Sequence, residues 1–185
     1  MINHVIRLSE ILILLFPSWL GAVPQDHPKE IPRRPDLVLE AKPTKPVYAR
    51  GEGVGLNFTL RNVSNRKLIV SRHLQLTLNV ALQVSGSEGR PAKWCGRIAD
   101  QIVPVKNRYA TLAPGKSILA ELTISCVNRN DPRHAWGYTI ETPGKYVIKA
   151  TYRLPQSEEY FKSLFPDEEV DRGPVMAEAV TIEVQ

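Results

Sequence analysis

The sequence predicts an all-β chain, folded as a sandwich of two antiparallel sheets. Three observations support this: apolar and polar residues alternate along several segments, turn-forming residues separate these segments, and a helix would scatter the same apolar residues round its surface. In the clearest segment, 54–60, Val54, Leu56, Phe58 and Leu60 would face a core. The alternation recurs at 76–84, 118–124, 146–152 and 180–184.

Turn-forming residues lie between these segments. Residues 62–67 and 85–89 are rich in Asn, Ser and Gly, which tolerate positive φ or bond their own backbone. The pairs Pro114–Gly115 and Pro143–Gly144 suit type II turns, because Pro presets φ and Gly accepts the left-handed position. Short alternating strands separated by such turns predict an immunoglobulin-like antiparallel β-sandwich.

One segment between 153 and 175 departs from this pattern and predicts a short helical insertion. Ser157 can cap a helix whose first turn carries Glu158 and Glu159, which favour the positive end of the helix dipole. Four apolar residues then recur at helical spacing: Tyr160, Phe161, Leu164 and Phe165. We expect this insertion to be a lid over the core, with a binding loop as the alternative.

The first 22 residues are typical of a signal peptide. His4 and Arg7 precede the apolar run 11–16, and the segment ends in small residues up to Ala22, which suit signal peptidase. The run is shorter than the roughly 20 residues that a membrane span needs. We therefore expect a secreted or periplasmic protein with no membrane span after cleavage; an uncleaved anchor and an N-terminal helix are the alternatives.

Residues 23–35 contain four prolines among charged residues and predict an extended linker. The β-sandwich domain is then expected over 36–185, long enough to bury a core. The formal net charge is +5, and its charges are mixed in sign along the chain. Nucleic-acid binding is not expected, because that function usually requires a basic stripe with interleaved aromatics.

Cys95 and Cys126 are the two cysteines of the chain. An exported protein meets oxidising conditions, which favours a disulfide between them. Two buried thiols and half of a metal site are the alternatives, although the cysteines lack the close spacing of a zinc motif.

Several motifs carry a resemblance to a known family. They are the strand end at 58–62, the Gly turn leading to a Trp at 86–94, and the Pro-Gly turns within 112–116 and 143–146. Over 41–153 the chain resembles the bacterial intracellular proteinase inhibitors, and the resemblance implies an immunoglobulin-type sandwich and proteinase inhibition. The cysteine pair and the helical insertion depart from the family's pattern.

No catalytic, metal-binding or cofactor-binding residues are expected. Ser64 and Lys67 have a Ser-x-x-Lys spacing, but they fall in a turn, whereas that chemistry needs both on one face of a buried helix. The sequence lacks the common hydrolase, metalloprotease and phosphate-loop motifs. The histidines show no ligand spacing, and the acidic stretch 167–171 lacks the pattern of a calcium loop. Asn62-Val63-Ser64 is a glycosylation sequon.

The predicted binding site is the loop 127–137, which contains Arg129, Arg133, His134 and Trp136. Arg and Trp are enriched in binding hot spots, and loops on a rigid sandwich often carry recognition. The alternative is that Trp136 merely covers one end of the core. We expect a non-catalytic, monomeric binding or accessory module for a protein or carbohydrate partner. A secreted proteinase inhibitor is the alternative, and an enzyme with an unrecognised site is a third possibility.

Overall fold

The computed structural model describes residues 35–86, 88–95, 108–126, 137–154, 158–166, 169–170 and 173–185. The predicted signal peptide, and the predicted linker up to residue 34, lie outside these ranges. The elements are β1 (Leu37–Pro43), β2 (Val47–Tyr48), β3 (Gly55–Asn62), β4 (Leu68–Ser71), β5 (Val80–Gly86), β6 (Tyr109–Leu112), β7 (Ser117–Thr123), β8 (Gly144–Tyr152), α1 (Glu158–Leu164), β9 (Glu169–Val170), β10 (Val175–Met176) and β11 (Val180–Val184).

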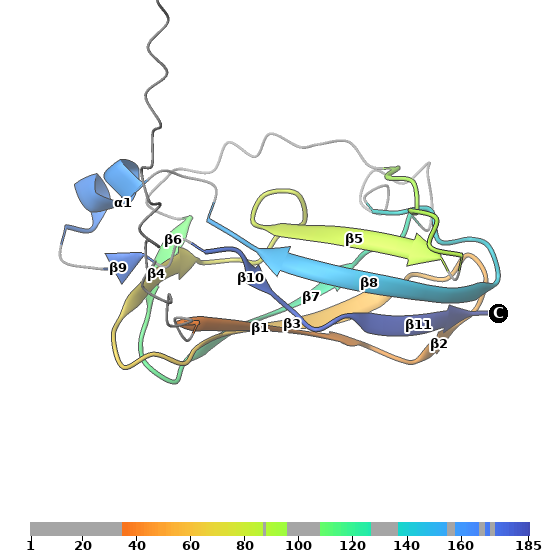
Figure 1. Ribbon diagram of the computed structural model, residues 1–185, viewed down its shortest axis with the longest axis horizontal. Helices are drawn as coiled ribbons and strands as arrows, with labels where there is room; N and C mark the ends of the chain where they lie inside the picture. Colours follow the sequence, from red (N-terminus) through yellow and green to blue (C-terminus); the bar gives the residue numbers. More distant parts are fainter. Residues whose placement is uncertain are drawn as a thin grey trace, which may run out of the picture. The chain divides into compact units, whose positions relative to one another are not determined.

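Two sheets form the sandwich (Figure 1). The first has the order β1-β3-β7, with both pairs antiparallel. In the second, β8 is central: β5 pairs with it along one edge, and β10 and β11 pair with it along the other. β2 adds to β11 in parallel, so the chain changes sheet between β1 and β2. This arrangement confirms the predicted all-β, immunoglobulin-like sandwich.

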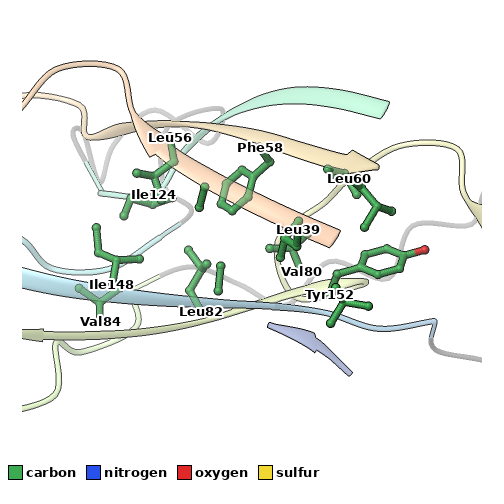
Figure 2. Close-up of a cluster of buried hydrophobic side chains, with 14 of the residues drawn as sticks. Leu39, Leu56, Phe58, Leu60, Val80, Leu82, Val84, Ile124, Ile148 and Tyr152 are labelled. Atoms are coloured by element: carbon green, nitrogen blue, oxygen red, sulfur yellow. The ribbon is translucent and has the colours of Figure 1, made fainter. Parts of the chain in front are cut away.

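The core lies between the facing surfaces of these sheets. Leu56, Phe58 and Leu60 of β3 are 0–1% exposed and face residues of β5 and β8 such as Leu82 and Ile148 (Figure 2). The other predicted strands alternate as well: the inward residues are buried in β5 and β8, buried or half-buried in β11, and half-buried in β7. Full burial of one large apolar side chain is worth about 1.5–3 kcal/mol, so these rows carry much of the stability.

The prediction of one strand over 76–84 was wrong for its first four residues. The chain turns at 77–79 and the strand begins at Val80. Asn79 holds this turn, since its side chain accepts a hydrogen bond from the Gln75 N–H (2.9 Å) and donates one to the His73 carbonyl (2.9 Å). Side-chain bonds of this kind compete with a strand ladder.

A third sheet, β6-β4-β9, was not predicted. All four residues of β4 are buried, so β4 lacks the alternation of a half-buried strand. Leu68 and Val70 join the main core, whereas Ile69 packs against a second cluster. β4 is thus covered on both faces, which explains why its sequence pattern gave no period of two.

The predicted helix is α1, and it covers this third sheet (Figure 1). Phe161 is 1% exposed and packs with Ile69 and Tyr109; its ring centre lies 4.7 Å from that of Tyr109, in an edge-on arrangement. Arg66 forms ion pairs with Glu169 of β9 and with Asp36, just before β1. The insertion is therefore a lid, but it covers a small cluster beside the sandwich and not the main core, where we expected it.

Two turn predictions have different outcomes. At Pro114–Gly115, Gly115 has a φ of +73°, and the Lys116 N–H donates to the Ala113 carbonyl (3.1 Å), as a type II turn requires. Gly144 has a φ of +141° instead and begins β8. Near that start, the Tyr146 hydroxyl donates to the Thr142 carbonyl (2.9 Å), which resembles the tyrosine corner of immunoglobulin-like domains.

Candidate functional site

The predicted disulfide between Cys95 and Cys126 is present, with the Cα atoms 6.5 Å apart. It joins two of three short segments, 93–95, 124–126 and 137–139, that lie side by side beyond the end of β7. The third segment runs between the other two, because Tyr138 bridges Trp94 on one side and Ser125 on the other. The disulfide therefore links the outer segments of a three-segment frame, which we call the disulfide frame.

Backbone hydrogen bonds fix the middle segment in this frame. Tyr138 donates its N–H to the Ile124 carbonyl (2.7 Å) and accepts from Cys126 N–H (3.1 Å), and the Cys95 N–H donates to Gly137 (2.9 Å). Gly137 has a φ of +147°, and a Cβ on it would lie 2.3 Å from the Ile124 carbonyl oxygen. Only glycine allows so close an approach of two backbones.

Tyr138 connects the disulfide frame to the second sheet. Its hydroxyl donates a hydrogen bond to the carbonyl of Leu82 in β5 (2.6 Å). Burial raises the pKa of Tyr138, since the ionised phenol would lose solvation there. The hydroxyl therefore keeps its proton and this bond at neutral pH, and the frame is held against the outer edge of β5.

A pocket of about 220 Å³ lies where Tyr138 meets β5. We call it the Trp94 pocket; its lining residues are Leu76, Thr77, Val80, Ala81, Leu82, Trp94 and Tyr138. Val80 and Leu82 also belong to the core (Figure 2), so the pocket opens over apolar side chains that the sandwich holds in place. The rings of Trp94 and Tyr138 pack edge to face, with their centres 5.1 Å apart.

The Trp94 pocket contains a buried polar atom and a strained backbone. Among the described residues the buried Nε1 of Trp94 has no hydrogen-bond acceptor, although buried polar groups are normally paired. Thr77 has a φ of +69°, which is unfavourable for a β-branched residue. Strained residues and unpaired polar groups are uncommon, and they concentrate at functional sites.

A second pocket of about 420 Å³ adjoins the first and shares Leu82 and Tyr138 with it. We call it the Lys149 pocket; its other lining residues are Gln83, Val84, Ser85, Pro91, Ala92 and Lys149. Lys149 and Gln83 are register partners in β8 and β5, and both are exposed. Lys149 is the one charged residue among the described residues that line the two pockets.

The predicted binding residues Arg129, Arg133, His134 and Trp136 lie outside the described residues. The residues that flank this loop, Cys126 and Gly137, both belong to the disulfide frame. The residues that line the two pockets were not among the predicted binding residues. Tyr138 gave no sequence signal, because its role depends on contacts with Leu82 and Trp94.

Two kinds of feature are absent from the described residues. They hold no group of three or more His, Cys, Asp or Glu side chains that could bind a metal ion. They also contain no helix long and apolar enough to cross a membrane. His73 is exposed, and His27 and His134 lie outside the described ranges.

Comparisons with known proteins add little. No protein family profile and no curated protein matches the sequence. A CARDB domain from Pyrococcus furiosus, crystallised in complex with di-metal ions, is 16% identical, with 82% of this chain and 89% of that chain covered and a TM-score of 0.38. A solution NMR structure of a CARDB domain from the same organism is 14% identical, with 81% of this chain and 94% of that chain covered and a TM-score of 0.36.

A mutant β-glucosidase from Listeria innocua in complex with laminaribiose is 18% identical, with a TM-score of 0.33. The match covers 92% of this chain but 20% of the glucosidase chain. At these scores the likenesses carry no argument about function. None of these matches is a proteinase inhibitor, so inhibition remains a prediction from the sequence resemblance alone.

Proposed function

We propose that this protein is an exported, non-catalytic binding module that holds an apolar group of its partner in the Trp94 pocket. The observation that carries the proposal is the apolar pocket of about 220 Å³ between the packed Trp94 and Tyr138 rings and the core side chains of β5. An apolar group that enters this pocket removes apolar surface from water, which is worth roughly 25 cal/mol per Å².

The disulfide frame supports the same proposal, because it orders the pocket before a partner arrives. Trp94 is adjacent to Cys95 of the disulfide in the sequence. Tyr138 accepts a hydrogen bond from the Cys126 N–H, and its hydroxyl donates one to β5. A wall that is already ordered reduces the entropy lost on binding. A disulfide also persists best in an oxidising compartment, which fits secretion or a periplasmic location.

The test is binding of the purified protein to arrays of glycans and of peptides, with a variant that fills the pocket. Ala81 lines the Trp94 pocket on the exposed face of β5, so Ala81→Trp should abolish binding. Leu119→Trp is the matched control, because Leu119 is 76% exposed and lines neither pocket. Retained binding by the Ala81 variant, or chemical turnover of an arrayed compound, would refute the proposal.

A further inference from the structure

The size of the Trp94 pocket restricts what it can hold. Its volume is about 220 Å³, and a dry cavity of roughly 150 Å³ accepts a benzene molecule. Drug-sized ligands occupy pockets of about 300–1,000 Å³. The pocket therefore fits one aromatic or branched aliphatic side chain. The Trp94 and Tyr138 rings together form one wall beside it, and Val80 and Leu82 form the floor.

The polar groups of the pocket favour a side chain over a sugar. The Tyr138 hydroxyl already donates to the Leu82 carbonyl and the Trp94 Nε1 is itself buried, so the Thr77 hydroxyl is the exposed donor among the described lining residues. A sugar ring would bury several hydroxyl groups against apolar residues without partners, which costs free energy. An aromatic side chain needs no such partners.

The charge of the adjoining Lys149 pocket adds a second requirement. Lys149 is the one charged residue among the described residues lining the two pockets. A carboxylate next to the aromatic side chain would complement it, whereas a cation there would be repelled. Because the two pockets share Leu82 and Tyr138, neighbouring residues of one peptide can reach both.

We infer that the two pockets together bind a protein segment in which an aromatic residue is adjacent to an acidic one. The aromatic side chain fills the Trp94 pocket, and the carboxylate lies beside Lys149. This inference rests on the proposed binding function and names its ligand.

The test follows the indole N–H resonance of Trp94 by two-dimensional NMR of the full chain. The chain has three tryptophans, and Trp94→Phe identifies the relevant signal. The probes are acetylated, amidated tetrapeptides with the central pairs Phe-Asp, Phe-Lys and Ala-Asp, together with cellobiose and laminaribiose. Both Phe peptides should shift the resonance, and the Ala peptide and the disaccharides should not.

The Phe-Asp peptide should bind about two- to fivefold more tightly than the Phe-Lys peptide, the range expected for an exposed ion pair. Lys149→Gln should remove this preference. Lys145→Gln is the matched control, since Lys145 is exposed on the same strand, four residues away, and lines neither pocket. Loss of the preference in both variants, or in neither, would contradict the role of Lys149.

Two outcomes separate this inference from the proposed function. If a disaccharide shifts the Trp94 resonance and the Phe peptides do not, the peptide ligand is wrong while the binding function stands. If no probe of either class shifts it, and the arrays also give no binding that depends on Ala81, both proposals fail.

Discussion

Asn62 provides the sharpest test of how this sandwich is held together. It ends β3, is 0% exposed, and uses its whole side-chain amide. Its Nδ2 donates to the carbonyls of Arg66 (2.7 Å) and Leu112 (2.8 Å), and its Oδ1 accepts from the N–H (2.9 Å) and hydroxyl (2.7 Å) of Ser64. The sequon residue therefore joins the turn after β3 to the end of β6.

Asn62→Ala should lower the free energy of unfolding by about 3 kcal/mol. A typical intramolecular hydrogen bond contributes about 1 kcal/mol net, and a buried group left unpaired costs about 1–3 kcal/mol. The variant removes the four bonds and leaves the Leu112 carbonyl without this donor, whereas the Arg66 carbonyl keeps a weaker contact with the Ser64 hydroxyl (3.2 Å). Ser64→Ala removes only the hydroxyl and should cost about 1 kcal/mol.

Urea unfolding followed by circular dichroism measures both variants. A loss of 3 kcal/mol should lower the midpoint by about 1–3 M, given the slopes usual for small proteins. Val63→Ala is the control within the same turn, since Val63 is 49% exposed, and it should change stability by less than about 0.5 kcal/mol. A cost for Asn62→Ala no larger than that for Ser64→Ala would refute the reasoning.

Three further predictions concern the frame and one exposed carboxyl. Replacing Cys95 and Cys126 together by Ser should cost about 3–4 kcal/mol in urea unfolding, because the disulfide closes a loop with a sequence separation of 31; an unchanged midpoint would contradict this. Gly137→Ala should cost about 2 kcal/mol or more, since its Cβ would meet the Ile124 carbonyl, and a thermal unfolding scan matching that of the unaltered protein would count against it. The pKa of the Glu52 carboxyl is lowered by the Lys45 side chain and then by the Ala49 N–H. The ionised Glu52 carboxylate thus stabilises the fold above the pKa that Glu52 has in the unfolded chain, and this stabilisation is lost as pH falls through its pKa in the folded protein. Lys45→Gln should raise the Glu52 pKa in an NMR titration, and no change would show that Lys45 is not the cause.

The sequence predicted the parts of the fold that have a period of two or a local turn signal. β3, β5, β8 and β11 each face the core on one side and solvent on the other, so their alternation is visible in the chain itself. α1 was predictable for a similar reason, because its apolar residues recur at helical spacing. β4 was missed, since burial on both faces removes the alternation.

The candidate site was predictable only in part. The sequence correctly paired Cys95 with Cys126, because a chain with two cysteines has one possible intrachain pairing. The sequence did not indicate that Trp94 and Tyr138, 44 positions apart, lie opposite each other. It also did not indicate that either residue lies close to Leu82. Those contacts depend on how the end of the first sheet meets the edge of β5.

Sequence alone therefore determined the class of fold, its main strands, its helical lid and its disulfide, since each leaves a local pattern or has a single partner. Tertiary structure alone decided the pockets, the burial of the Trp94 indole N–H and the shared walls at Tyr138 and Leu82. The physical reason is that a pocket consists of residues distant in sequence, and only the packing of the two sheets brings them together.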